Sequence, residues 1–171
     1  PLFRGHAQPS PGSSTDDPTW SNSGKFGKGL SFDGGDYVTM GDVNAFDGLT
    51  DMSYSFWAKK TNTASTGYVL SKSYLNFAFL IQGDDTNAVA YFANGSGSYT
   101  AVALTHTGTT TTNWNHYTVT KNGNTVSYYV NGVRKYSATA SIPTTLPSNS
   151  LAFVIGADSQ GGVNSFFPGL I

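Results

Sequence analysis

Residues 113–135 read NWNHYTVTKNGNTVSYYVNGVRK, a sequence that predicts two consecutive β-hairpins. Asn122-Gly123 and Asn131-Gly132 each separate short runs that are rich in Val, Tyr and Thr. Asn-Gly is a strong signal for a tight hairpin turn, because both residues readily adopt positive φ. We therefore expect a three-stranded antiparallel meander from Trp114 to Ala138.

Similar short runs, closed by Gly, Asn or Asp, recur along the rest of the chain. None of the connections is long enough for a crossover helix, which argues against a parallel sheet. We therefore predict an all-β fold, a two-sheet antiparallel jelly-roll sandwich without substantial helix. The expected strands are Leu2–His6, Gly29–Phe32, Asp36–Met40, Met52–Lys59, Gly67–Lys72, Leu75–Gln82, Ala88–Ala93, Thr100–Thr105, Trp114–Lys121, Thr125–Val130, Val133–Ala138 and Leu151–Ala157.

The 171 residues are enough for one domain with a sizeable core. Residues 1–23 are expected to form a first strand and a Pro/Ser-rich loop, and residues 24–171 the sandwich domain. The net charge is -1 and no basic cluster stands out, so nucleic acid is not an expected partner. No apolar run is long enough to predict a membrane span.

Several catalytic classes are excluded or disfavoured by composition. The absence of Cys excludes disulfides, zinc–thiolate sites and a Cys nucleophile. The chain also has no Glu, whereas glycoside hydrolysis usually needs two carboxyl groups that face each other across the sugar bond. The Asp16/Asp17 and Asp84/Asp85 pairs are adjacent in predicted loops and are not expected to converge. We predict no catalytic residues and no enzyme activity.

The three histidines do not suggest a catalytic group. His6, His106 and His116 are far apart in the sequence, and no Ser-His-Asp arrangement follows from their positions. We expect His116 at the edge of the core, bonded to a backbone carbonyl. His106 ends a predicted strand beside a Thr-rich loop, and we expect it to be solvated.

Five segments resemble, in family order, the laminin-G-like, concanavalin A-like jelly-roll domains. They are GKFGKGLSFDGGDYVTMGD (Gly24–Asp42), MSYSFWAKK (Met52–Lys60), the 113–135 segment, LAFVIGAD (Leu151–Asp158) and SFFPGLI (Ser165–Ile171). The resemblance implies a jelly-roll sandwich with Trp57 and Trp114 in its core. The family usually continues past the Gly-x-Ile near Ile171 with Asp residues and a final strand, so we expect that last strand to be lacking.

The resemblance also implies a structural Ca²⁺. The candidate ligands are Asp33 and Asp36, with backbone carbonyl oxygens of the same Gly-rich turn, because Ca²⁺ binds six to eight hard oxygens. Asp42 and Asp47 are weaker candidates in an expected loop. The alternative interpretation is that Asp33 and Asp36 cap a tight turn.

Exposed aromatic rings are the other candidates, because lectin-like sites stack such rings on sugar faces. Trp20 lies in the N-terminal loop region and Tyr99 follows a Gly- and Ser-rich loop. Tyr128 and Tyr129 must point to opposite faces of their strand, so one of them is expected to face outward. We take Trp20, Tyr99 and Tyr129 as the candidate ligand-binding residues.

Two functions remain open. The first is a non-catalytic extracellular binding or adhesion module that recognises a glycan or a surface protein. The alternative is a structural subunit or decoration domain of a virion, tail fibre or cell-surface filament, held by neighbouring subunits of a homo-oligomeric assembly through an exposed strand edge. Both predict an extracellular, cell-surface or virion-surface location.

Overall fold

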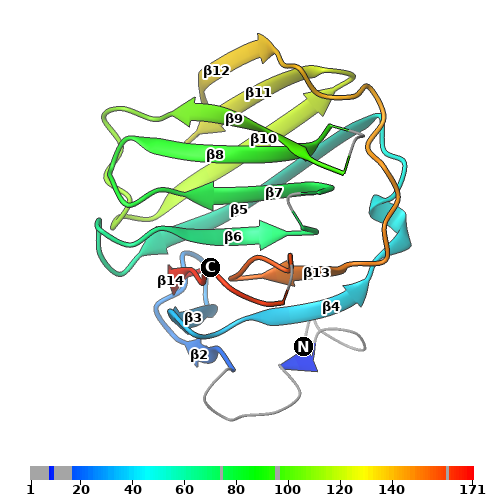
Figure 1. The fold of residues 1–171 in the computed structure, drawn as a ribbon. Coiled ribbons are helices and arrows are strands. Elements are labelled where there is room, and N and C mark those ends of the chain that lie inside the picture. Colours follow the sequence, from blue (N-terminus) through cyan, green and yellow to red (C-terminus); the bar gives the residue numbers. More distant parts are fainter. Residues whose placement is uncertain (1–7, 10–16, 74, 95–96, 161) are drawn as a thin grey trace.

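Two seven-stranded antiparallel sheets lie one behind the other and enclose the core (Figure 1). The computed structural model describes residues 8–9, 17–73, 75–94, 97–160 and 162–171. The predicted two-sheet jelly-roll architecture is thereby confirmed. A single 3₁₀ turn, η1 (Asn44–Phe46), is the helical element among the described residues, and none of their helices is long and apolar enough to cross a membrane.

Sheet 1 has the strand order β1-β4-β13-β6-β7-β8-β9. Its strands are β1 (Gln8–Pro9), β4 (Val38–Asp42), β13 (Ala152–Ile155), β6 (Gly67–Ser71), β7 (Phe77–Ile81), β8 (Asn87–Ala93) and β9 (Tyr99–Thr105). Sheet 2 has the order β12-β11-β10-β5-β14-β3-β2. Its strands are β12 (Val133–Thr139), β11 (Thr125–Val130), β10 (Asn115–Asn122), β5 (Asp51–Lys60), β14 (Pro168–Leu170), β3 (Gly29–Asp33) and β2 (Thr19–Ser21).

The predicted meander is present as β10, β11 and β12. Asn131 and Gly132 have φ of 52° and 79°, so both residues of the second turn occupy the region that favours Asn and Gly. Tyr128 is fully buried in the core, and Tyr129 on the same strand faces outward. The alternation expected for this strand is therefore confirmed.

The strand boundaries differ from those predicted by a few residues. Some observed strands are longer than predicted, as Asp51–Lys60 is against Met52–Lys59, and others are shorter, as Ala152–Ile155 is against Leu151–Ala157. The short strand β2 lies in a segment that the sequence assigned to a loop. The predicted strand Leu2–His6 lies outside the described residues.

The core lies between the two sheets and is rich in aromatic rings. Sheet 1 directs Phe77, Phe79 and Ile81 of β7 inward, and sheet 2 directs Tyr117 and Tyr128 against them. Burial of each such side chain stabilises the fold by roughly 1.5–3 kcal/mol. This packing fixes which residues of each strand face outward, and so determines the two outer surfaces.

Trp57 and Trp114 face outward, which corrects the prediction that they belong to the core. On β5 the even-numbered residues point inward, where Ala58 is fully buried. Trp57 has the opposite parity and pairs with His116 on the outer face of sheet 2. His116 is likewise on the outer face, and its main-chain N–H, not its ring, is bonded to Asn131.

His106 is buried, which corrects the prediction that it is solvated. Its side chain has no exposed surface, and its Nδ1 lies 3.0 Å from the hydroxyl of Tyr128. The strand β9 ends at Thr105, and the main-chain N–H of His106 then donates a hydrogen bond to the Thr86 carbonyl at 2.7 Å. Burial lowers the pKa of His106 to about 4, so the ring is neutral at physiological pH.

Candidate functional site

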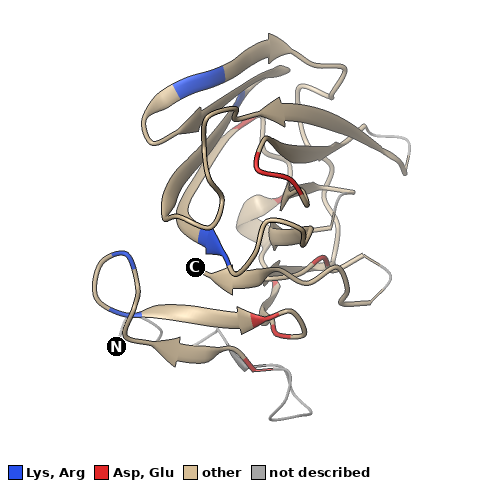
Figure 2. Ribbon diagram, turned by 90° about the vertical axis from the view of Figure 1, so that its left-hand side faces the viewer, with Lys and Arg blue, Asp and Glu red and all other residues tan. Residues whose placement is uncertain are grey.

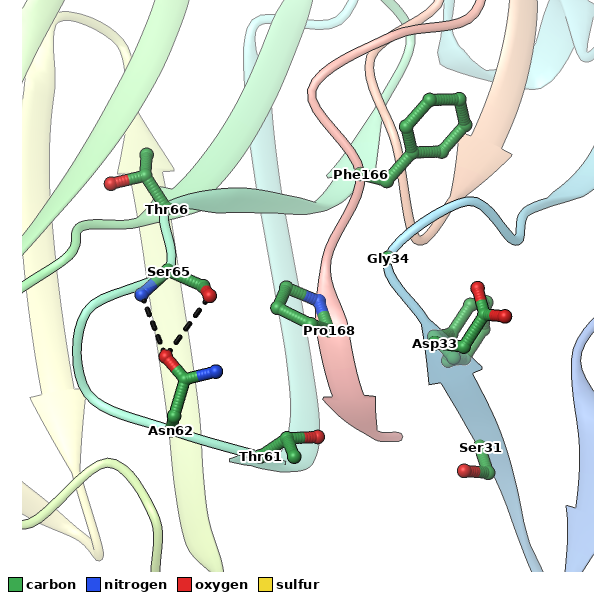
Figure 3. A pocket seen from close by; sticks show the side chains of 10 residues that line it. Ser31, Asp33, Gly34, Thr61, Asn62, Ser65, Thr66, Phe166 and Pro168 are labelled. Atoms are coloured by element: carbon green, nitrogen blue, oxygen red, sulfur yellow. Dashed lines mark hydrogen bonds between the residues drawn. The ribbon is translucent and has the colours of Figure 1, made fainter.

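A groove opens at the end of the sandwich where the β3–β4 turn, the β5–β6 loop and the approach to β14 meet (Figure 3). We call it the polar groove. Its volume is about 630 Å³. Hydroxyl and amide groups, one carboxylate and the rings of Phe and Pro line it, from Ser31, Phe32, Asp33, Gly34, Thr61, Asn62, Ser65, Thr66, Phe166 and Pro168.

One wall of the polar groove is the β3–β4 turn. Asp33 Oδ1 accepts a hydrogen bond from the Gly35 N–H at 2.9 Å, and Asp36 Oδ2 accepts one from the Asp33 N–H at 2.8 Å. Gly34 has φ of 107°, a conformation that residues with a side chain rarely adopt. The DGGD sequence therefore builds a tight, fixed wall.

The opposite wall is the β5–β6 loop, which a single amide organises. Asn62 Oδ1 accepts hydrogen bonds from the Ala64 N–H, the Ser65 N–H and the Ser65 hydroxyl, each at 3.0 Å. Figure 3 shows the amide nitrogen of Asn62 turned toward Pro168, across the floor of the groove. The loop thus presents an amide donor and several hydroxyl groups to whatever enters.

The floor comes from the segment that leads into β14. Pro168 pairs with Asp33, and the main chain of Phe166 lies directly against Gly67 at the start of β6. A Cβ on Gly67 would overlap the Phe166 carbonyl, so the close approach requires glycine. Phe166 also packs on Tyr37, with ring centroids 6.3 Å apart. Segments about 100 residues apart in the sequence are brought together here.

Three tyrosine rings continue from this groove across the outer face of sheet 1. Tyr68 of β6 donates its main-chain N–H to the Ser165 carbonyl, beside the groove. Its ring centroid lies 5.7 Å from that of Tyr91 on β8, which lies 5.4 Å from that of Tyr99 on β9. We call Tyr68, Tyr91 and Tyr99 the tyrosine platform.

The tyrosine platform becomes more exposed from β6 to β9. Tyr68 is buried, Tyr91 is half-buried and Tyr99 is 43% exposed. Burial raises the pKa of both Tyr68 and Tyr91, and the hydrogen bond between their phenols also raises the pKa of Tyr68 and lowers that of Tyr91. An apolar layer supports the rings from below, made of Ala78, Leu80 and Val89.

A buried carboxyl group holds the loop next to the platform. Asp158 is 2% exposed, and its Oδ1 accepts a hydrogen bond from the Ser71 hydroxyl at 2.6 Å. Two main-chain hydrogen bonds join Asp158 and Asn164, at 2.9 and 3.1 Å. Burial raises the pKa of Asp158, and the hydrogen bond from Ser71 opposes that shift. The role of Asp158 in the fold is therefore to anchor this loop.

The three ligand-binding candidates from the sequence lie at separate places. Tyr99 belongs to the tyrosine platform. Trp20 is 62% exposed on β2, at the edge of sheet 2, and Tyr129 is on the outer face of sheet 2. The sequence therefore identified one member of the platform and missed Tyr68 and Tyr91. Their alternation with the buried residues of β6 and β8 was a signal that could have identified them.

Asp33 and Asp36 remain predicted calcium ligands without support from their surroundings. Their carboxylates accept hydrogen bonds from main-chain N–H groups of their own turn. Calcium needs six to eight oxygens. Among the residues that the structure describes, no three or more Asp, Glu, His or Cys side chains are close enough to hold a metal ion. The geometry accounts for both residues as turn caps.

Asp42 and Asp47, the weaker calcium candidates, bind a lysine. The ammonium of Lys72 has no exposed surface and lies 2.7 Å from Asp42 Oδ1 and 3.0 Å from Asp47 Oδ1. It also donates to the Val43 carbonyl at 3.2 Å. This arrangement ties β6 to β4 and to the turn that follows β4.

Comparison with known proteins gives one family match. The family model of the concanavalin A-like lectin/glucanases superfamily matches residues 32–171. A search of curated proteins found no significant match.

Solved structures with a similar fold include binding domains. The binding domain of Paraclostridial Mosquitocidal Protein 1 has a TM-score of 0.65 at 14% identity, over 90% of this chain and 40% of that one. Domain 4 of AbnA, a GH43 extracellular arabinanase from Geobacillus stearothermophilus solved with arabinotriose, has a TM-score of 0.63 at 21% identity, over 93% and 74% of the two chains. The CBM40 of the Ruminococcus gnavus IT-sialidase, bound to α2,3 sialyllactose, has a TM-score of 0.63 at 13% identity, over 84% and 85%.

Because the sequence identities are low, the solved structures establish the fold alone. The present chain spans less than half of the length of the mosquitocidal binding domain. The family model is more specific, because it covers most of the sequence. Two antiparallel sheets with the strand order described above agree with it. The chain belongs to the concanavalin A-like lectin/glucanase superfamily.

Proposed function

We propose that this chain is a non-catalytic, extracellular carbohydrate-binding module. The observation that carries the proposal is the polar groove, where hydroxyl and amide side chains surround the rings of Phe166 and Pro168. A sugar has hydroxyl groups that both donate and accept hydrogen bonds, and C–H faces that pack on such rings. The groove offers both kinds of contact, because six of its ten lining residues have polar side chains and the others include two phenylalanines and a proline.

The tyrosine platform gives the groove a natural extension. A saccharide chain that enters beside Phe166 can continue past the buried Tyr68 to the more exposed rings of Tyr91 and Tyr99, because these rings follow one another across sheet 1. We therefore expect an oligosaccharide to bind more tightly than its single sugar.

The side chains of the described acidic residues support a non-catalytic role. Asp84 accepts hydrogen bonds from Thr86 and Asn87, and Asp85 accepts hydrogen bonds from Thr111. In the polar groove Asp33 is the one carboxylate in the lining. Hydrolysis of a glycosidic bond usually requires a facing pair of carboxyl groups.

The comparisons suggest where to begin a ligand search. Domain 4 of AbnA was solved with arabinotriose, and a neutral oligosaccharide of this kind suits a groove without a net positive lining. The first experiment is a glycan array of neutral oligosaccharides that includes arabinotriose. Isothermal titration calorimetry of the strongest candidates follows.

Variants then place the bound sugar. We expect Tyr99→Ala to weaken binding of the best oligosaccharide by about twofold to tenfold, the range of an aromatic contact. Tyr129→Ala is the matched control, because this tyrosine lies on the other sheet and should leave affinity unchanged. Failure of every neutral oligosaccharide on the array and in calorimetry would refute the proposed function, and equal effects of the two variants would refute this location.

A further inference from the structure

A second pocket lies between the outer face of sheet 2 and the loop that joins β2 to β3, at the other end of β3 from the polar groove. We call it the lysine–tryptophan pocket. Its volume is about 210 Å³, and its lining is Lys25, Phe26, Lys28, Gly29, Phe56, Trp57, Trp114 and Ile171. This volume is below the roughly 300–1,000 Å³ of pockets that enclose drug-sized ligands, and it suits a single ring.

Aromatic rings form the walls of this pocket. Phe26 is 75% exposed at the tip of the loop, and its ring lies edge-on to Trp57 with centroids 5.5 Å apart. The centroid of the His116 ring lies 5.2 Å from that of Trp57. Phe26 therefore presents an exposed apolar ring at the rim of the pocket, next to Trp57.

Lysine ammonium groups lie over these rings. Lys25 Nζ is 4.7 Å from the centroid of the Trp57 ring, and Lys59 Nζ is 5.6 Å from that of Trp114. Lys28 adds a third positive charge to the rim. Figure 2 shows the blue segments of the β2–β3 loop and of the end of β5 on the same side of the sandwich.

The polar side-chain atoms that line this pocket are all donors. They are lysine ammonium and tryptophan indole N–H groups, neither of which can accept a hydrogen bond. Its lining has no carboxylate, amide or hydroxyl side chain, in contrast to the polar groove. A neutral sugar needs acceptors for its hydroxyl hydrogens, whereas an anionic group needs only donors and positive charge.

We propose that the lysine–tryptophan pocket binds one acidic sugar ring, through a carboxylate or sulfate held by Lys25 and Lys28 and an apolar ring face held by Phe26 and the two tryptophans. The anionic group supplies the acceptors and the negative charge that this lining lacks. The pocket and the polar groove share no lining residue, although both lie beside β3 and β14 of sheet 2. The ligand of the pocket therefore does not depend on the neutral glycan proposed above.

Three closely matched probes test the proposal on the full chain. They are lactose, 3′-sulfated lactose, which adds a sulfate group, and α2,3-sialyllactose, which adds a sugar ring that carries a carboxylate. We expect one or both acidic sugars to bind with a change in tryptophan fluorescence, and lactose to bind at least tenfold more weakly. Lys25→Gln should weaken acidic-sugar binding by about threefold, the scale of an exposed ion pair, and Phe26→Ala by about fivefold.

Matched controls separate this pocket from general attraction of anions. Lys135→Gln removes an equal charge on β12, and Val133→Ala trims another exposed apolar side chain. All four substitutions are at exposed positions, and thermal melts check that each variant is folded. Equal losses from Lys25→Gln and Lys135→Gln would overturn the proposal, as would equal binding of lactose.

The alternative occupant is a membrane surface, because Lys-Phe-Gly-Lys (residues 25–28) places an exposed ring between two cations. Vesicles of phosphatidylserine and phosphatidylcholine test it by co-sedimentation. Vesicle binding that Phe26→Ala abolishes, with no binding of either acidic sugar in the millimolar range, would overturn the proposal in favour of a membrane. Neither result affects the polar groove, whose test uses Tyr99→Ala and neutral sugars.

Discussion

The hydroxyl of Tyr128 lies 3.0 Å from Nδ1 of His106, where neither side chain has exposed surface. Among the described residues, none is a hydrogen-bond partner for His106 Nε2. Protonation would therefore place a charge on a buried ring that has no acceptor for its second N–H. The nearby carboxylates of Asp84 and Asp85 favour the charged form, but desolvation outweighs them.

The first prediction concerns acid stability. The pKa of His106 is about 4 in the folded protein and about 6.5 in the unfolded chain, so below pH 6.5 the unfolded state binds more protons. The stability contributed by the neutral ring is present above pH 6.5 and is lost as the pH falls toward 4, by about 2–3 kcal/mol. Urea denaturation at several pH values should show this loss.

The matched variant for this prediction is His106→Gln, which cannot titrate. Asp158 acts in the opposite direction, because its raised pKa makes the folded state bind more protons in acid. The difference between the wild type and His106→Gln isolates the histidine. Identical pH profiles for the two proteins would show that His106 is not responsible.

A second prediction concerns the buried hydrogen bond between Ser71 and Asp158. Ser71→Ala removes the donor and leaves Asp158 Oδ1 without this partner in a buried site, which should cost about 1–3 kcal/mol of unfolding free energy. The pKa of Asp158 should rise further, so the loss is larger at pH 7 than at pH 4. Denaturation of Ser71→Ala and of the double variant with Asp158→Asn tests this. A cost that the second substitution does not reduce would contradict it.

The third prediction concerns the ion pairs of Lys72, in which the lysine side chain is fully buried and the two aspartates are partly exposed. Removal of both Asp42 and Asp47 by substitution with Ala leaves a buried ammonium with the Val43 carbonyl alone, and should cost about 3–5 kcal/mol. Lys72→Met leaves two carboxylates that retain partial contact with water, and should cost about 1 kcal/mol or less. Thermal and urea unfolding of the two variants should rank them in this order. The reverse order would mean that the lysine side chain contributes mainly by packing.

The fourth prediction separates the two interpretations of the Asp33–Asp36 turn. Asp36→Ala removes the acceptor for the Asp33 N–H, and should destabilise the protein by about 1–2 kcal/mol in EDTA as well as in calcium. Melting temperatures of wild type and variant in the two buffers make the comparison. A rise of the wild-type melting temperature with calcium that Asp36→Ala removes would instead place the predicted ion at this turn.

The three strands of the meander and their pairing follow closely from the sequence, because hairpin turns and alternation are local signals. Asn131-Gly132 needs only its own φ preferences to form the turn between β11 and β12. The same alternation also contained the orientation of Trp57, since Ser53 and Ser55 share its parity and Tyr54 does not. The family resemblance suggested a core position for Trp57, and the alternation was the better guide.

The polar groove could not be predicted in the same way. Its lining joins Ser31, Asn62 and Phe166, whose neighbours in the sequence do not specify that they meet. His106 is a similar case, because the turn that follows β9 decides its burial. Local patterns assign a residue to a face of a strand, whereas packing between distant loops decides whether that residue is reached by solvent.

The position of β14 has a consequence for the order of assembly. Residues 168–170 insert between β3 and β5, whose residues lie more than 100 positions earlier in the chain. Until this segment arrives, β3 and β5 have unpaired main-chain groups toward each other, and β2 and β3 have no connection to the rest of sheet 2. Until residues 168–170 are synthesised and paired, the edges of β3 and β5 are therefore open to pairing with other strands. Closing so long a loop is slow, on a scale of roughly milliseconds to seconds for sandwiches of this kind.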